Sequence, residues 1–255
     1  MSETEQPTKT YRGNCQCGAF VFELEAPEIK TTSNCTCSIC SKRAYLWVMP
    51  SKPLKIIKDD GKLVHYSFGA KNMDHQLRTL QDVDIRSLEV ITLDGKSYDP
   101  QYVAAKYLGA EPNPPGFENG KTYHGSCHCG AVTAAIKING SLEDGAYDES
   151  VGDAWISSAE NQFAIQGSEK IAYYVFGNHI WRKSFCQTCG VNIATGPDPN
   201  TSAEEIAELS EEAQQFRETM RNKRLFNTRV LDAFDVKSLK STKGDGVAGV
   251  EAGTM

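Results

Sequence analysis

Apolar and polar residues alternate in several short runs of this chain, and glycine or polar residues bound each run. The clearest examples are AFVFELEA after Gly18, AVTAAIKI after Gly130 and IAYYVF at 171–176. Alternation with a period of two, combined with β-branched and aromatic residues, is typical of strands that bury one face. The pattern therefore predicts a mainly β protein with antiparallel strands.

One segment has the helical period instead. After Asn200, Thr201 and Ser202 are candidate N-caps, with Glu204 and Glu205 three residues further on. Apolar residues then recur at three- and four-residue spacing as far as about Lys223. We expect one added helix that packs an apolar stripe on its domain, formed by Ile206, Leu209, Ala213, Phe216 and Met220.

The sequence is internally duplicated. YRGNCQCGA at 11–19 matches YHGSCHCGA at 123–131, and further matches pair Trp47 with Trp155, the strand-like HYSFG at 65–69 with YYVFG at 173–177, and VDIRSL at 83–88 with FDVKSL at 234–239. We predict two diverged tandem copies at 11–109 and 121–240, joined by a Pro/Gly/Asn-rich linker at 110–120. The ends, 1–10 and 241–255, are expected to be disordered.

Composition excludes several classes of protein. The 255 residues are 40% hydrophobic with a net charge of -6, which rules out wholesale disorder. No apolar run approaches the roughly 20 residues of a membrane span, and the first ten residues lack the features of a secretory signal. Without a Lys/Arg cluster, neither nucleic acid nor a membrane is an expected partner. We expect the protein in the cytosol or the nucleus.

All nine cysteines fall in groups two or three residues apart. A chain expected in a reducing compartment keeps its thiols free, so grouped cysteines indicate metal binding, and the spacing favours zinc. Neither CxxC has the βαβ context of a thioredoxin-like redox motif. The groups are Cys15 and Cys17; Cys35, Cys37 and Cys40; Cys127 and Cys129; and Cys186 and Cys189.

The second copy contains two chelating pairs, Cys127 with Cys129 and Cys186 with Cys189. Four thiolates complete a tetrahedron around zinc and leave no position for a substrate, so this set predicts a structural ion. A cross-copy set in which Cys15 and Cys17 replace the first pair is an alternative, because a threefold longer loop costs only about 1 kcal/mol more to close. The repeat register favours the set within the second copy.

The first copy is different, because three thiolates come from one short loop. Cys35, Cys37 and Cys40 would occupy three positions of a tetrahedron and leave the fourth to water or a substrate sulfur, as in catalytic zinc sites. Lys42 and Arg43 follow and would offset the thiolate charge. The alternative is a closed second structural site, in which Cys15 or Cys17 supplies the fourth ligand.

The remaining candidate ligands are histidines and one aspartate. A residue inside a CxC points away from the metal that its neighbours bind, so His128, and His124 ahead of it, are expected beside the site or on the surface. Asp74 and His75 lie close to where the first copy would have its second cysteine pair, and are candidate substitute ligands.

The motifs GNCQCG, NCTCSIC followed by SKR, GSCHCG and FCQTCG resemble those of the glutathione-dependent formaldehyde-activating enzyme and centromere protein V family, in a tandem, fungal-like arrangement. The resemblance implies an Mss4-like zinc-binding β fold, a structural zinc at Cys127, Cys129, Cys186 and Cys189, and a catalytic zinc at Cys35, Cys37 and Cys40. It also implies carbon–sulfur lyase chemistry on adducts of an aldehyde with a thiol such as glutathione.

Neither copy contains the full set of family motifs. The first lacks FCxxCG after Gly69, and the second lacks CxCxxC between Ala131 and Trp155. Either the copies have specialised, which predicts two zinc ions per chain, or the chain is a truncated gene product. We expect a zinc-dependent carbon–sulfur lyase acting at Cys35, Cys37 and Cys40; the alternative is a non-catalytic, zinc-stabilised binding or scaffold module derived from that family.

Overall fold

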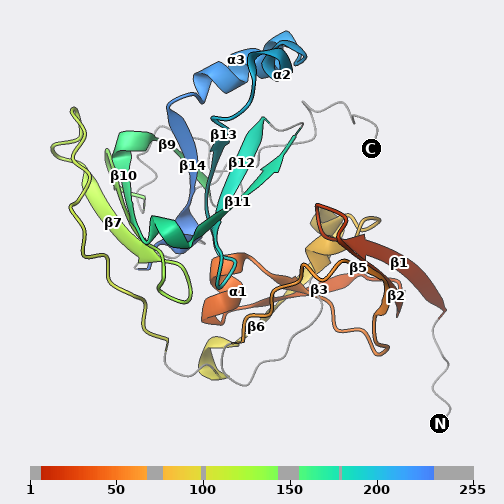
Figure 1. The fold of residues 1–255 in the computed structure, drawn as a ribbon. Helices are drawn as coiled ribbons and strands as arrows, with labels where there is room; N and C mark the ends of the chain where they lie inside the picture. Colours follow the sequence, from red (N-terminus) through yellow and green to blue (C-terminus); the bar gives the residue numbers. More distant parts are fainter. Residues whose placement is uncertain (1–6, 68–76, 99–101, 143–154, 178–179, 233–255) are drawn as a thin grey trace. The chain divides into compact units, whose positions relative to one another are not determined.

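A computed structural model describes residues 7–67, 77–98, 102–142, 155–177 and 180–232. The chain divides into two compact units, Met1–Tyr102 and Val103–Met255. Both units consist mainly of strands (Figure 1). Within the described ranges, no helix is both long enough and apolar enough to span a membrane.

The first unit contains two three-stranded sheets. In one sheet, β1 (Thr8–Asn14) and β5 (Lys55–Asp59) flank β2 (Phe20–Pro27), with antiparallel pairing throughout. In the other, β3 (Thr31–Cys35) lies between the antiparallel β4 (Leu46–Trp47) and the parallel β6 (Glu89–Leu93). Helix α1 (Ser38–Arg43) follows β3, and short 3₁₀ turns occur at Leu77–Thr79, Ile85–Ser87 and Lys96–Tyr98.

Two separate apolar clusters stabilise this unit. The alternation of β2 buries one of its faces, and Phe22, Leu24 and Ala26 pack there with Tyr11 and Leu80. The second cluster consists of Cys35, Cys37, Cys40 and Trp47. A small sheet with few buried residues benefits from an additional constraint such as a bound ion.

The second unit contains a three-stranded and a five-stranded sheet. In the former, β7 (Lys121–Ser126) and β10 (Phe163–Gln166) flank β8 (Thr133–Ile138). The latter has the order β11 (Ile171–Phe176), β12 (Trp181–Cys186), β13 (Asn192–Pro197), β14 (Lys223–Asn227), β9 (Trp155–Ala159), and every pairing is antiparallel. Additional 3₁₀ turns occur at Glu160–Gln162, Ser168–Lys170 and Thr228–Val230.

The two CxC turns, one in each unit, are built by the same hydrogen bonds. The backbone N–H of the first cysteine donates to the carbonyl five positions later, at 3.0 Å for Cys15 and 2.8 Å for Cys127. The N–H of Gly18 and of Gly130 donates back to that cysteine's carbonyl, at 2.9 and 3.1 Å. Both glycines have positive φ angles, 66° and 78°, which a residue with a Cβ rarely adopts.

Two further hydrogen bonds recur in both units, at or within one residue of the offsets of the sequence matches. In each unit a tyrosine hydroxyl accepts a 2.9 Å hydrogen bond from a backbone N–H beyond the following strand, from Ile29 to Tyr11 and from Leu142 to Tyr123. The carbonyl three residues before the first cysteine of the CxC turn accepts a bond from a backbone N–H far along the unit. These bonds run from Gln81 to Arg12 at 3.0 Å and from Asp232 to His124 at 3.1 Å. The same backbone frame therefore occurs twice in the chain.

Strand β1 begins at Thr8, so residues 8–10, predicted to be disordered, belong to a sheet. Thr8, Lys9 and Thr10 pair with Pro27, Ala26 and Glu25. The partner strand supplies backbone hydrogen bonds that composition alone does not reveal.

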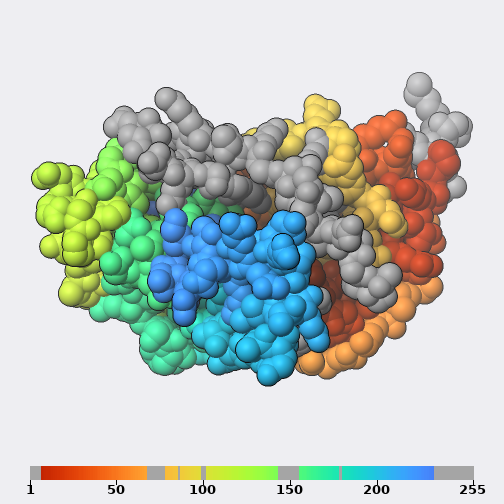
Figure 2. Space-filling view, turned by 90° about the horizontal axis from the view of Figure 1, so that it is seen from above, coloured from red at the N-terminus to blue at the C-terminus, as the bar shows by residue number. Residues whose placement is uncertain are grey.

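The predicted single helix is wrong in its continuity, because the structure has α2 (Ala203–Ala207) and α3 (Glu211–Thr219). Ser202 caps α2 in a box with Glu205, as the sequence indicated. The side chain of Ser210 accepts a bond from Ala213 N–H and begins a second helix, since serine favours caps over helix interiors. These helices lie on the surface of the second unit (Figure 2).

The expectation of a strand at HYSFG is also wrong over its described part, because residues 65–67 belong to no strand. Its counterpart in the second unit is β11, which pairs with β12, the strand that carries the first cysteine of FCQTC. The first copy lacks that motif. Among the described residues, no strand pairs with residues 65–67, and a segment without a partner leaves its backbone groups unpaired.

Residues 103–120 belong to the second unit. The Pro/Gly/Asn-rich segment 110–120, predicted as a linker, contacts the three-stranded sheet of this unit. Asn113 accepts a 2.7 Å hydrogen bond from Lys137 Nζ, and the carbonyl of Gly116 accepts a 3.2 Å hydrogen bond from Asn139. The predicted tail, 241–255, lies outside the described residues.

Candidate metal centres

The structure brings together the four cysteines of the second unit. Cys127 and Cys129 come from the turn between β7 and β8, Cys186 ends β12, and Cys189 lies in the turn between β12 and β13. Their Sγ atoms all lie within 4.8 Å of one another. Cys129 Sγ is 3.6 Å from the Sγ atoms of both Cys127 and Cys186. Because four sulfurs at about 2.3 Å from zinc are about 3.8 Å apart, this spacing fits a tetrahedral zinc site.

Electrostatics in this cluster favour a bound cation. Cys127, Cys186 and Cys189 have no exposed surface. The hydrogen bond from Cys127 to Cys189 raises the pKa of Cys127, which burial raises further, and it lowers the pKa of Cys189. Burial is also the main reason that the pKa of Cys129 is raised. The four thiols cannot all ionise in this buried cluster without a cation, because their negative charges repel one another. A divalent ion compensates the charge of the thiolates.

The turns that carry these cysteines are rigid. The N–H of Val132 donates to Cys127 Sγ at 3.2 Å, and the N–H of Gly190 donates to the carbonyl of Cys186 at 2.8 Å. Gly190 has a φ of 67°, as its place in a tight turn predicts. Hydrogen bonds to sulfur stabilise thiolate ligands and fix their orientation.

A second cluster forms in the first unit from Cys35, Cys37 and Cys40, whose Sγ atoms also lie within 4.8 Å of one another. Cys35 ends β3, Cys37 is the N-cap residue of α1, and Cys40 lies within that helix. All three are at least 95% buried. In the part of the chain that the structure describes, no fourth histidine, cysteine or carboxylate joins this group. We refer to it as the three-cysteine cluster.

Two residues that the sequence analysis did not connect with the three-cysteine cluster support it. Trp47 Nε1 donates a 3.3 Å hydrogen bond to Cys40 Sγ. Gly95, in the turn after β6, lies so close that a Cβ atom there would overlap Cys35 Sγ and contact the backbone of Cys37. In the sequence, Trp47 is a repeat landmark, and the dipeptide Asp94-Gly95, which the sequence analysis does not use, is a local turn signal that could have drawn attention to Gly95.

Burial and neighbouring thiols also raise thiol pKa values in the three-cysteine cluster, as they do in the four-cysteine cluster of Cys127, Cys129, Cys186 and Cys189. The neighbouring Cys37 is the main cause of the raised pKa of Cys40, and burial adds to it, against the hydrogen bond from Trp47. Burial is the main cause of the raised pKa of Cys35. Lys42, on the same short helix, is buried with its Nζ 5.9 Å from the ring centroid of Tyr102. Three thiolates around a divalent ion leave one negative charge, which this lysine would offset.

The close approach at Gly95 gives a testable prediction. Replacement of Gly95 by valine should displace Cys35 Sγ, because the neighbouring turn is tied to Thr36 by backbone and side-chain hydrogen bonds and has little room to move. We expect the zinc content to fall from two ions per chain to one, as measured by mass spectrometry of the metal.

The control is Gly61→Ala, since a Cβ at Gly61 would meet no atom within 4 Å, although its φ of 68° disfavours alanine. This variant should retain both ions. Equal metal content in Gly95→Val and the parent protein would contradict the role assigned to the turn.

The third group, Cys15 and Cys17, joins neither cluster. The two sulfurs lie 3.4 Å apart, and Cys17 is exposed. The N–H of Phe20 donates to Cys15 Sγ at 3.3 Å. Burial opposes ionisation of Cys15, but this bond, the Cys17 thiol and neighbouring backbone groups outweigh it and lower its pKa. Neither Cys15 nor Cys17 lies within ligand spacing of the three-cysteine cluster, so this geometry gives no support to the closed alternative.

Of the described histidines, His65, His124 and His128 belong to neither cluster. His124 is on the surface, where Nε2 lies 3.0 Å from Glu111 Oε1 and the ring stacks on Tyr107. His128 is only 4% exposed, so a surface position is wrong for it. Asp74 and His75 lie outside the described residues.

The fold and these sites define a mainly β protein with several small sheets and two cysteine clusters, each able to hold a metal ion such as zinc. No protein-family model matches the chain, and no curated protein matches it in sequence. A crystal structure of a Rhodobacter sphaeroides protein is similar to 47% of this chain and 97% of its own, with 18% sequence identity and a TM-score of 0.33.

Proposed function

We propose that this protein is a zinc-dependent carbon–sulfur lyase that acts on adducts of an aldehyde with a small thiol such as glutathione. The observation that carries the proposal is the three-cysteine cluster. Three convergent sulfurs from one short segment, with no fourth protein ligand among the described residues, fit the donor set of a zinc site that keeps a position for a substrate sulfur.

The proposal includes the family resemblance. The two units would be diverged copies of an Mss4-like zinc fold of the glutathione-dependent formaldehyde-activating type. Recurrence of the CxC turn and of the long-range hydrogen bonds at or within one residue of the sequence offsets supports this relationship. The four-cysteine cluster would then be structural and the three-cysteine cluster reactive, which assigns one role to each copy.

The chemistry requires a stabilised thiolate. In the lyase direction, the carbon–sulfur bond of a 1-hydroxyalkyl thioether breaks, its electron pair stays on sulfur, and the hydroxyl proton leaves oxygen as the carbonyl forms and ends on the released sulfur. The products are a thiol and an aldehyde. Zinc, when bound, supplies a Lewis acid that stabilises the sulfur anion. Trp47 Nε1–H withdraws charge from Cys40 Sγ, and the buried Lys42 adds a positive charge to the same helix.

The direct test measures the exchange between formaldehyde and its glutathione adduct by NMR. We expect the zinc-loaded protein to accelerate this exchange, and Cys37→Ala to remove the acceleration by more than about 100-fold, beyond the usual cost of losing an outer-shell partner. Cys17→Ser is the matched control and should retain the parent rate, since Cys17 belongs to neither cluster. Equal rates for the parent and Cys37→Ala would refute the proposed activity.

A second candidate function is a metal-stabilised binding or scaffold module without catalysis. The observation that favours it is the deep burial of the cluster, where Cys37 has no exposed surface and Cys35 and Cys40 have 5% or less. Cobalt substitution separates the two functions. A cobalt spectrum that changes when glutathione is added supports the lyase, whereas a spectrum that does not respond supports the binding module.

A further inference from the structure

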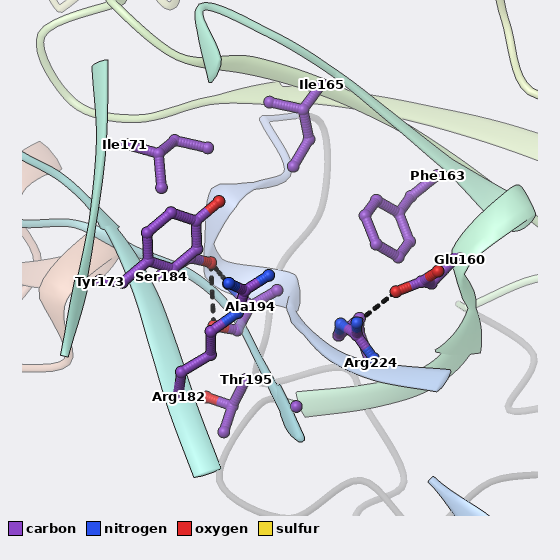
Figure 3. A pocket seen from close by; sticks show the side chains of 11 residues that line it. Glu160, Phe163, Ile165, Ile171, Tyr173, Arg182, Ser184, Ala194, Thr195 and Arg224 are labelled. Atoms are coloured by element: carbon purple, nitrogen blue, oxygen red, sulfur yellow. Dashed lines mark hydrogen bonds and ion pairs between the residues drawn. The ribbon is translucent and has the colours of Figure 1, made fainter. Parts of the chain in front are cut away.

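The second unit contains a cavity of about 230 Å³ that neither metal cluster uses (Figure 3). Its base is one face of the five-stranded sheet, because the register places Tyr173 opposite Ser184 and Arg182 opposite Gly196. Phe163 of β10 closes another side.

Arg182 is the cation in this cavity that has no acidic partner. Its guanidinium lies over the ring of Tyr173, with its central carbon 4.4 Å from the ring centroid. Across the described ranges, it makes no hydrogen bond and no ion pair. Stacking on an aromatic face fixes the plane of a guanidinium and leaves its N–H edge available for an acceptor.

Arg224 is the second cation of this cavity, and the carboxylate of Glu160 compensates its charge. Its side chain is 16% exposed and forms an ion pair with Glu160. Burial is the main reason that its pKa is lowered, and Arg182 contributes in the same direction. The side chain lies across Gly196, where a Cβ atom would collide with it. The absence of a side chain at Gly196 therefore leaves the room that this arginine occupies at the cavity wall.

The cavity has a net positive charge and an apolar wall. Two arginines and one glutamate line it, which leaves one uncompensated positive charge. Phe163, Ile165 and Ile171 provide the apolar surface. The space far exceeds what one water molecule needs, so it can accommodate a small organic molecule.

We propose that this cavity binds a small organic monocarboxylate with a short apolar or aromatic body. The planar fork of Arg182 matches the two oxygens of a carboxylate, and the single excess charge matches a monoanion better than a phosphate dianion. Phe163 and Ile165 then cover the body of the ligand. This site is separate in its residues from the proposed lyase site and does not depend on it.

The test uses benzoate as the probe, with benzamide as its neutral analogue of the same shape, in calorimetric titrations of the full-length zinc-loaded chain. We expect benzamide to bind at least about 10-fold more weakly than benzoate, because a charge-assisted pair with Arg182 is lost. Inorganic phosphate should bind more weakly than benzoate. Equal affinity for benzoate and benzamide, or tighter binding of phosphate, would overturn the assignment.

Two variants locate the site. Arg182→Gln should weaken benzoate binding by at least about 10-fold, whereas Arg221→Gln, at an arginine that is 70% exposed and paired with Glu218, should bind like the parent. Gly196→Ala keeps every charge but displaces Arg224, and should also weaken binding. Zinc content and circular dichroism show that each variant is folded. Unchanged affinity in a folded Arg182→Gln protein would refute the proposal.

Discussion

Replacement of Cys186 by serine should remove one zinc ion per chain and unfold the second unit. Cys186 is fully buried, and its Sγ lies 3.6 Å from that of Cys129, so serine would leave an incomplete ligand set in the protein interior. Structural zinc contributes about 10–16 kcal/mol in small zinc domains, which is comparable to the stability of a typical domain, about 5–15 kcal/mol. We expect loss of cooperative thermal unfolding for this unit, measured by circular dichroism alongside the metal content.

The matched control is Cys17→Ser, because Cys17 is exposed and its CxC turn has the same backbone hydrogen bonds without a nearby cysteine pair. This variant should keep two zinc ions and the parent unfolding temperature. A Cys186→Ser protein with two ions and unchanged thermal unfolding would show that the four-cysteine cluster does not bind structural zinc.

Phe226→Ala should destabilise the second unit by about 3–5 kcal/mol. Phe226 has no exposed surface, and its ring centroid lies 5.9 Å from that of Phe163. Removal of the ring leaves a cavity between the five-stranded sheet and β10, which the surrounding strands cannot fill without breaking their pairing. Denaturant unfolding of zinc-loaded protein measures the loss.

Phe216→Ala provides the comparison, because it removes the same side chain from a different environment. Phe216 lies on α3 with 54% of its surface exposed, and its ring centroid lies 5.5 Å from that of Trp181. We expect a loss of about 1 kcal/mol. Similar losses at Phe216 and Phe226 would contradict the division into core and surface described above.

Local sequence signals were reliable where the chain interacts with itself at short range. IAYYVF forms β11 with the boundaries that the alternation gave, and Ser202 with Glu205 forms the cap that the spacing indicated. The prediction of one continuous helix failed at Ser210. The apolar period does not exclude a serine at this position, but serine is also a favourable N-cap, and here it begins a second helix. The HYSFG prediction failed over residues 65–67, where no described strand pairs with them, because a strand depends on a partner that residue patterns alone do not show.

By itself, the sequence determined the donor atoms of both clusters and the glycine turns that carry the CxC and CxxC motifs, because ligand spacing and positive φ angles act over a few residues. Only the tertiary structure decided that Cys127 and Cys129, rather than Cys15 and Cys17, meet Cys186 and Cys189. The cost of loop closure did not discriminate between these two pairs, because a longer loop costs little more to close. It also decided that Gly95 approaches Cys35 and that Arg182 faces an apolar cavity. These contacts join segments far apart in the chain, where sheet register, rather than local preference, sets which side chains meet.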